Sequence, residues 1–142
     1  MSNTIKNLSQ LDSAMEKYCY YAVSKMGEKV KKKIDEFIRY YYLEYTPDQY
    51  ERTWKFLNSV VKTEPRKINN GFEVEVYVDT SLKYSNGWTM QGTANYANAG
   101  LHGNIKVGEM KFWDDMLDEL PQIITDAFKD FMASKGINVS YR

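Results

Sequence analysis

Few residues in this sequence could form a nucleophilic catalytic site. Such a site needs a nucleophile, a base within hydrogen-bond reach and a group that orients the base. The chain has one cysteine, Cys19, and one histidine, His102. Cys19 falls beside the apolar stripe of a predicted helix, where cysteine usually acts as a small buried hydrophobic residue. His102 falls in a polar segment between Gly100 and Gly103, so we expect it to be structural or solvent-facing. A Cys19–His102 pair has no support from the sequence.

The sequence also contains few residues that could form a metal or phosphate site. With one Cys and one His, any further metal ligands would have to be carboxylates. Asp114, Asp115, Asp118 and Glu119 form an acidic cluster at helical spacing, but an exposed helix face explains it. The glycine-rich stretch QGTANYANAGLHGN lacks the GxxxxGK[ST] pattern of a phosphate loop. We therefore expect no catalytic residue, no metal and no cofactor.

A basic patch in the N-terminal part of the chain allows two interpretations. The patch consists of Lys29, Lys31, Lys32, Lys33 and Arg39. Basic side chains next to tyrosines can follow a nucleic-acid backbone. Four lysines within five residues also point in all directions around a helix and are often simply solvated. The patch is therefore a candidate DNA-facing surface, with a solvated helix face as the alternative.

A long amphipathic helix has to position these residues. Apolar residues recur at gaps of three or four from Leu8 to Tyr41, which predicts a helix over about 8–43. Thirty-six residues span roughly 54 Å, whereas a compact chain of this size has a diameter of about 37 Å. The helix must therefore break, with Gly27 as the expected position, or extend past the domain and pack on another molecule.

The rest of the chain predicts a small α+β domain. Thr46-Pro47-Asp48 is typical of a helix start and predicts a short helix over about 47–59, with Tyr50, Trp54 and Leu57 on one face. The period then changes from 3.6 to 2, and Phe72, Val74, Val76 and Val78 share one side, which predicts a hairpin over about 60–79. Asn70-Gly71 favours the turn, and Pro65 must lie at an edge or a bulge.

A polar segment and a second helix complete the predicted order. Residues 80–108 are rich in Gly, Asn, Ser and Thr and predict mostly loop, with possible strands at 87–91 and 104–107. A loop of this length suggests a role in docking. Its candidate docking residues are Tyr84, Trp88, Tyr96 and His102. Helical spacing returns over about 109–135, where Pro121 kinks the helix or begins another and Gly136 ends it. The predicted fold is α+β, with a long N-terminal helix and a C-terminal helix packed on a small antiparallel sheet built around a β-hairpin.

Composition sets the class of protein. A chain of 142 residues with 43% hydrophobic and 27% charged residues predicts one domain, 1–142. A single cysteine excludes a disulfide-stapled secreted fold and favours a reducing compartment. No segment is apolar enough to span a membrane, and the first residues lack the apolar core of a signal peptide, so we expect an intracellular chain without a membrane partner. Nineteen basic and nineteen acidic residues balance, which disfavours a general nucleic-acid coat protein.

Tyrosines and charge asymmetry favour contacts between protein molecules. Eight of the 12 tyrosines precede residue 51. Consecutive tyrosines cannot all lie on one helical stripe, so some must face outward, where aromatic residues suit an interface. The candidate interface residues are Tyr20, Tyr21, Tyr40, Tyr41, Tyr42 and Tyr45. Residues 1–70 hold 13 basic and 9 acidic residues, a net +4, and residues 71–142 hold 6 and 10, a net −4. Such polarity suits head-to-tail packing of identical subunits, with solvated helix faces as the alternative.

The order of these segments resembles a known family. The basic N-terminal helix is followed by YTPDQYERTWKFLNSV, by a hairpin with NNGFEVEVYVD, and by a polar loop and a closing helix that ends KDFMASKGI. Together they resemble the neck and minor tail proteins of tailed bacteriophages, the tail-completion or head–tail joining proteins. In many members a proline-containing turn, an arginine and a Leu-x-x-Ser-Ile type ending follow the first helix. Here Pro47, Arg52, Leu57, Ser59 and Val60 occupy comparable places. The Asp-Thr-Gly and Phe-Gly-Thr segments of the commoner pattern are absent.

This resemblance implies a virion protein that is not an enzyme. It would form a ring, for which a hexamer is one expected size, at the junction between portal and tail tube. Its partners would be further copies of itself and the adjacent neck, portal-side or tail-tube proteins, with transient contact with packaged DNA. It would be located in the virion and, during assembly, in the host cytoplasm. The alternatives are a nucleic-acid-binding accessory protein that uses the basic patch, and an enzyme that uses Cys19 and His102 or the acidic cluster.

Overall fold

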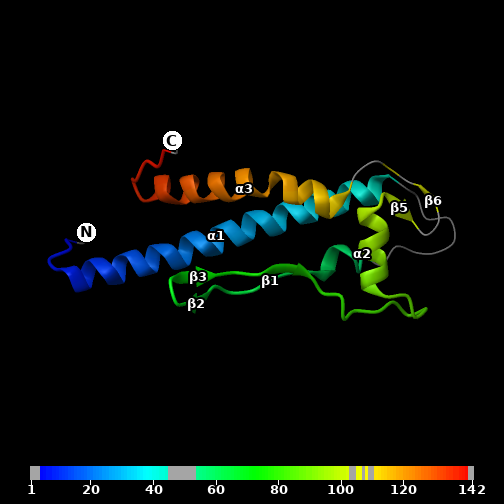
Figure 1. Ribbon diagram of the computed structural model, residues 1–142, viewed down its shortest axis with the longest axis horizontal. Coiled ribbons are helices and arrows are strands. Elements are labelled where there is room, and N and C mark those ends of the chain that lie inside the picture. Colours follow the sequence, from blue (N-terminus) through cyan, green and yellow to red (C-terminus); the bar gives the residue numbers. More distant parts are fainter. Residues whose placement is uncertain (1–3, 45–53, 103–104, 107, 109–110, 141–142) are drawn as a thin grey trace.

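The fold consists of three elongated elements that lie side by side, with α1 in the middle. The computed structural model describes residues 4–44, 54–102, 105–106, 108 and 111–140. Helix α1 (Leu8–Leu43) contacts helix α3 (Phe112–Ser134) on one side and a β-hairpin on the other (Figure 1). Helix α3 runs antiparallel to α1, and a short helix, α2 (Met90–Asn98), crosses the end of the molecule near the C-terminus of α1. The predicted α+β fold is confirmed.

Helix α1 is continuous over 36 residues, as the spacing predicts. Asn7 caps its start, because the Asn7 side chain accepts a hydrogen bond from the backbone N–H of Gln10 at 2.9 Å. The helix does not break at Gly27, which is buried inside it. Instead, its first turns extend past both α3 and the hairpin (Figure 1). Of the two outcomes that its length allowed, the structure has the overhanging helix.

The hairpin is formed by two short antiparallel ladders in line. Strand β1 (Val60–Lys62) pairs with β4 (Val76–Val78), and β2 (Arg66–Ile68) pairs with β3 (Gly71–Glu73). Pro65 lies in the interruption between β1 and β2, which agrees with its inability to donate a ladder hydrogen bond. The turn is Asn69-Asn70, one residue earlier than the predicted Asn70-Gly71, because Ile68 pairs with Gly71.

The inward face of the hairpin is the predicted one. Phe72 packs edge-on against the ring of Tyr20 in α1, with ring centroids 5.6 Å apart. Val76 and Val78 pack against the core, whereas Tyr77 on the opposite face is 41% exposed. All four inward residues are only partly buried, because a two-stranded ribbon covers little surface.

The predicted short helix over 47–59 is wrong in its described part. Residues 45–53, with Tyr50 and Tyr45, lie outside the described residues. Trp54 has φ +59°, which is incompatible with a right-handed helix, and only Leu57–Ser59 form a single 3-10 turn, η1. Phe56, Leu57, Ser59 and Val60 are all buried. The left-handed backbone at Trp54 and the extended backbone at Val60 limit the helical part to this single turn.

Helix α2 is the main feature that the sequence analysis missed, since residues 80–108 were expected to be mostly loop. Thr89 caps it by accepting the backbone N–H of Gly92 at 3.1 Å. Met90 and Ala97 face the core and are fully buried. The expected strand at 87–91 is therefore wrong apart from an isolated bridge between Lys83 and Thr89. The expected strand at 104–107 is present as β6 (Ile105–Lys106), which pairs with β5 (Leu101–His102).

Helix α3 is one helix, not two. Pro121 lies inside it and is exposed, so the proline neither divides the helix nor begins another. The helix ends as predicted, with Gly136 at φ +78°. The backbone N–H of Gly136 donates to the carbonyl of Ala133, and that of Ile137 donates to Met132, at 2.9 Å each. This is the Schellman pattern of a glycine-terminated helix.

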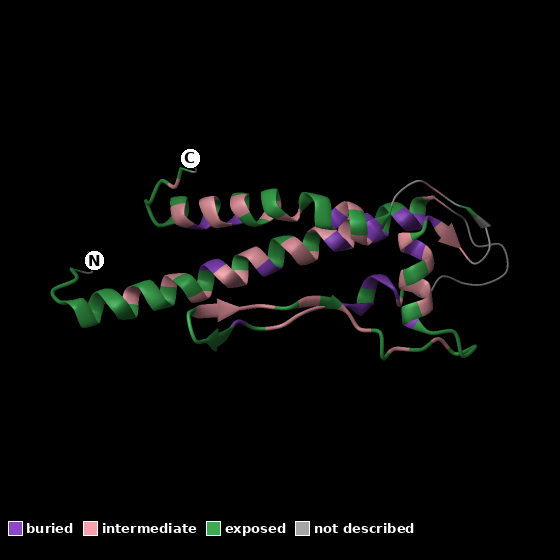
Figure 2. Ribbon diagram, in the orientation of Figure 1, coloured by how far each residue is buried: buried purple, intermediate pink, exposed green. Residues whose placement is uncertain are grey.

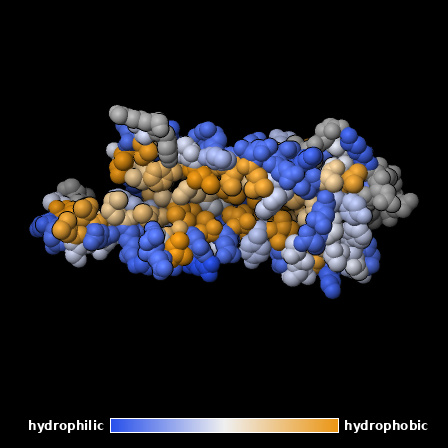
Figure 3. Space-filling view, in the orientation of Figure 1, coloured by the Kyte–Doolittle hydropathy of each residue, from blue (hydrophilic) through white to orange (hydrophobic). Residues whose placement is uncertain are grey.

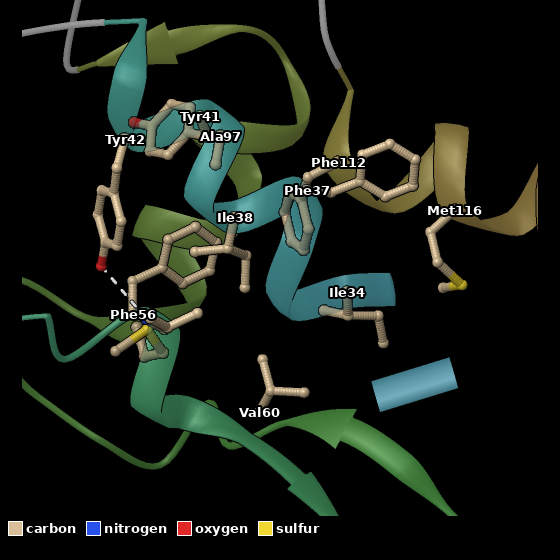
Figure 4. Close-up of a cluster of buried hydrophobic side chains, with 12 residues drawn as sticks. Ile34, Phe37, Ile38, Tyr41, Tyr42, Phe56, Val60, Ala97, Phe112 and Met116 are labelled. Atoms are coloured by element: carbon tan, nitrogen blue, oxygen red, sulfur yellow. Dashed lines mark hydrogen bonds between the residues drawn. The ribbon is translucent and has the colours of Figure 1, made fainter. Parts of the chain in front are cut away.

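The hydrophobic core lies at the end of the molecule where α1, α2, η1 and the start of α3 meet (Figures 2 and 4). Phe56 is at its centre, with Tyr41, Tyr42 and Phe112 packed edge-on around its ring. The Tyr42 hydroxyl accepts the backbone N–H of Leu57 at 3.2 Å, drawn as a dashed line in Figure 4. Tyr41 donates to the carbonyl of Leu101 at 2.9 Å. Burial falls steadily from this end toward the N-terminus of α1.

Candidate interaction surfaces

The first turns of α1 form an apolar surface that no described part of the chain covers. We call residues Leu8–Met15 the arm. Leu8, Leu11 and Met15 fall on one face of the helix, at i, i+3 and i+7, and are 77%, 40% and 52% exposed. Ile5, just before the helix, is 48% exposed. Figure 3 shows apolar side chains gathered at this end of the molecule and again over α3.

The arm is a defined helix despite its lack of packing. In addition to the Asn7 cap, the Gln10 side chain accepts the backbone N–H of Lys6 at 2.8 Å. This reciprocal pair satisfies two backbone donors at the helix start. The hairpin contacts α1 just beyond the arm, where Lys67 forms an ion pair with Glu16 and Phe72 packs on Tyr20. The arm therefore extends as a preformed helix from a fixed point.

The predicted interface tyrosines are in different environments. Tyr21 and Tyr40 are exposed, at 45% and 52%, and remain candidates. Tyr20 is partly buried against the hairpin. The interface prediction is wrong for Tyr41 and Tyr42. They are 3% and 6% exposed and belong to the core, so neither can anchor another molecule. They are buried because the core closes around the last turns of α1 from both sides. Tyr45 lies outside the described residues.

The basic patch lies largely beside carboxylates of the same chain. Lys31 pairs with Asp35 at 2.8 Å, and Lys33 pairs with Glu36 at 3.5 Å and with Glu119 of α3 at 3.1 Å. The hydrogen bond to Glu119 raises the pKa of Lys33 above its usual value, and the negative charge of Glu36 adds to this effect.

A groove between α1 and α3 holds more of these charges. Lys29, Lys32 and Lys33 line it together with acidic residues of α3, in a cavity of about 540 Å³. Its acidic lining residues are Glu36, Glu119, Asp126 and Asp130. Only Arg39 of the patch lies away from this groove and these ion pairs. DNA contact through the patch stays a prediction, and Lys33 is the patch lysine with an ion pair to α3 among the described contacts.

The predicted docking residues of segment 80–108 do not form one loop surface. Trp88 is 44% exposed and stacks on Tyr96 of α2, with ring centroids 5.5 Å apart. Its indole N–H donates to the Thr93 hydroxyl at 3.0 Å, so the ring is held in place. Tyr84 packs against the core, and His102 is partly buried in β5. Trp88 and Tyr96 are therefore the aromatic pair available to another molecule.

The structure does not bring the potential catalytic residues together. Cys19 is exposed on the N-terminal half of α1, so the expectation that it is buried is wrong. His102 lies in β5 at the opposite end of the molecule (Figure 1). In the acidic cluster, Asp115 accepts the backbone N–H of Lys111 at 3.0 Å and Glu119 pairs with Lys33. Among the described residues, no three His, Cys, Asp or Glu side chains are placed to hold a metal ion. No described helix is both long enough and apolar enough to cross a membrane.

Comparison with known proteins gives one match. The family model named YomN matches residues 7–134. The chain belongs to the YomN family. No curated protein and no solved structure matches the sequence.

The match to YomN covers the whole described fold. It begins at Asn7, the cap of α1, and ends at Ser134, the last residue of α3. The overhanging arm is therefore part of the matched region and not an addition to it. The matched region contains every helix and strand described here.

One positioning residue in this YomN-family chain was not found from the sequence. The residue before α3, Lys111, makes no side-chain cap. Asn98 at the end of α2 supplies it instead, because its side-chain oxygen accepts the backbone N–H groups of Trp113 and Asp114, at 3.0 and 3.1 Å. Only the tertiary structure brings α2 to this position, so no local pattern could reveal the cap.

We expect Asn98→Ala to destabilise the protein by about 1–2 kcal/mol, because two donors at the start of α3 lose their acceptor. Asn98→Asp should retain most of the stability, since a carboxylate accepts the same hydrogen bonds and is favoured at a helix N-terminus. Urea unfolding followed by circular dichroism measures both. Equal losses in the two variants would show that the side-chain oxygen has no capping role.

Proposed function

We propose that this chain is a structural virion protein of a tailed phage, a neck, head–tail joining or tail-completion component that acts by forming a ring at the portal–tail junction. The observation that carries the proposal is the uncovered apolar arm. A preformed helix that presents Leu8, Leu11 and Met15 to solvent is typical of a surface that another molecule covers.

The energetic argument is simple. Full burial of a Leu, Ile or Met side chain stabilises a protein by about 1.5–3 kcal/mol relative to exposure. Ile5, just before the arm, and Leu8, Leu11 and Met15 within it are between 40% and 77% exposed. Covering them would contribute roughly 3–6 kcal/mol per contact, which is comparable to the cost of association, so stable assembly requires several such contacts in one particle.

The order of the elements supports the phage assignment. A long N-terminal helix, a hairpin and a closing helix occur in the order of the neck and minor tail proteins that this sequence resembles. The charge distribution suits identical subunits in a ring as well. Helix α3 holds six acidic residues and one basic residue, whereas α1 holds seven basic and five acidic residues. Head-to-tail contacts place unlike surfaces of neighbouring subunits together.

The proposed role requires partners rather than a catalytic site. These partners are further copies of this chain and the adjacent neck, portal-side or tail-tube proteins, and the location is the virion. Transient contact with packaged DNA would follow from the position of the ring, with Arg39 as the patch residue outside both the α1–α3 groove and the described ion pairs. We propose that the chain has no enzymatic activity of its own.

Light-scattering mass determination across a wide concentration range tests this proposal. The 16.6 kDa chain should form a concentration-dependent species, and a hexamer would have a mass of roughly 100 kDa by simple multiplication. Electron microscopy of that species should show closed rings. A chain that stays monomeric at high concentration, and also in the presence of purified tail components, would contradict the proposal.

A further inference from the structure

We propose that the arm of one copy binds the outer face of α3 on a second copy. This inference rests on the proposed ring and names the contact that would build it. The occupant is a second copy because this chain carries both an uncovered apolar helix and an uncovered apolar strip of matching form.

The receiving surface is a stripe along α3. Leu117, Pro121, Ile124 and Phe128 follow one another at i, i+4, i+7 and i+11 and share one helical face. Leu117 and Ile124 are 45% and 38% exposed, Pro121 is exposed, and Phe128 is partly buried. We call these four residues the α3 stripe. A different face of α3, with Met116, Ala127 and Phe131, packs inside the molecule.

The α3 stripe is longer than the arm stripe, and the two cannot meet within one molecule. The arm stripe from Leu8 to Met15 is about 10 Å long and the α3 stripe is about 16 Å long. The α3 stripe is therefore long enough to receive the arm. Within one chain the arm extends past the end of α3 (Figure 1), so it can reach such a stripe only on another copy.

The area of the arm favours a ring over an isolated pair. The exposed parts of Ile5, Leu8, Leu11 and Met15 amount to roughly 400 Å², about half of what one partner contributes to a standard interface. One such contact binds weakly. In a closed head-to-tail ring each copy binds a neighbour through its own arm and also receives the arm of the other neighbour, so every subunit makes two such contacts. Assembly should therefore depend steeply on concentration.

Two sets of substitutions test the contact from its two sides. Leu8→Glu with Leu11→Glu blocks the arm and should not harm folding, because both residues are exposed and acidic residues are favoured in the first turn of a helix. Ser9→Glu with Ser13→Glu adds the same charge to the opposite face of the arm as a matched control. Leu117→Gln with Ile124→Gln blocks the α3 stripe, with Ala133→Gln as its control. Circular dichroism confirms that each variant is folded.

The decisive measurement is the mass of the two blocked variants, separately and mixed. Each blocked variant alone should stay monomeric, with self-association at least tenfold weaker than that of the unmodified chain. The control variants should assemble like the unmodified chain. At concentrations well above those at which the unmodified chain assembles, a mixture of the two should give a 1:1 dimer, since one variant keeps its α3 stripe and the other its arm. Assembly of the arm variant into rings would overturn this inference and leave the ring proposal standing. If the copies form open chains that depend on the arm but never close into rings, the ring proposal is contradicted and this inference stands.

Cysteine cross-linking keeps the inference testable if the isolated chain assembles weakly. In a Cys19→Ser background, a Leu8→Cys chain is mixed with an Ile124→Cys chain under mild oxidation. The 8–124 disulfide dimer should exceed by at least fivefold the product that Leu8→Cys forms with Ala133→Cys chains. Equal yields from the two mixtures would overturn the inference.

Discussion

Replacing Phe56 by alanine should cost about 3–5 kcal/mol of unfolding free energy, the largest single effect expected in this protein. Phe56 is 1% exposed, and its ring is surrounded by Tyr41, Tyr42 and Phe112, with centroids 6.0, 6.4 and 5.2 Å away. Alanine would leave a cavity that these rings cannot fill without leaving their edge-on arrangement. Phe56→Leu should cost less, about 1–2 kcal/mol, because most of the volume remains.

Urea unfolding followed by circular dichroism measures this effect as a shift of the midpoint. Domains of this size typically have 5–15 kcal/mol of stability, so Phe56→Ala should remove a large share of it. Leu43→Ala is the matched control, because Leu43 is 79% exposed and its truncation should change stability by less than about 0.5 kcal/mol. A loss below about 1 kcal/mol for Phe56→Ala would show that this residue is not at the centre of the core.

Replacing Gly27 by leucine should destabilise the protein by about 1–3 kcal/mol. Gly27 lets the hairpin approach α1 closely: a β-carbon at this position would lie 3.0 Å from both methyl groups of Val74 and 3.2 Å from the side chain of Lys62. A leucine would force the hairpin away from the helix. Helix propensity alone would change stability in the opposite direction, because it favours leucine over glycine by slightly less than about 1 kcal/mol.

A double-mutant cycle separates crowding from propensity. Gly27→Ala should lie within about 1 kcal/mol of the unmodified protein, because its propensity gain of about 1 kcal/mol is offset by the shift that Val74 must make. Val74→Ala removes those methyl groups, so Gly27→Ala should become stabilising in that background. A coupling of at least about 0.5 kcal/mol is expected in chemical unfolding experiments. Strict additivity would show that Val74 does not crowd this position.

The sequence predicted those elements whose signal is local and repeated. The 3.6-residue period over 8–43 predicted α1, and the period of 2 from Phe72 to Val78 predicted the inward face of the hairpin. Gly136 predicted the end of α3, because a glycine past the last turn accommodates the left-handed conformation found there. Each of these patterns reports directly on the backbone or on the side that is buried.

The sequence failed where a distant contact decides the local structure. The sequence contains a helix cap, Thr89, and apolar residues at helical spacing, Met90, Ala94 and Ala97, that indicate α2. The high Gly and Asn content of the segment favoured a loop prediction instead. Only the fully buried positions of Met90 and Ala97 against the core explain the helix. The predicted exposure of Tyr42 failed for the same reason, since nothing local shows that the core also surrounds this residue, whereas Tyr41 already lay at the end of the apolar stripe.

The candidate surfaces divide in the same way. Length alone predicted that α1 would extend past the domain if it did not break, because its period requires more helix than a compact fold can cover. The tertiary structure decided that the uncovered part is the N-terminal arm, because α3 and the hairpin both end before it. It also decided that the basic patch lies beside acidic groups of α3, since the antiparallel packing of the two helices brings together charges as distant in the chain as Lys33 and Glu119. Periodicity determines which faces are apolar, and only the packing of distant segments determines which of those faces remain uncovered.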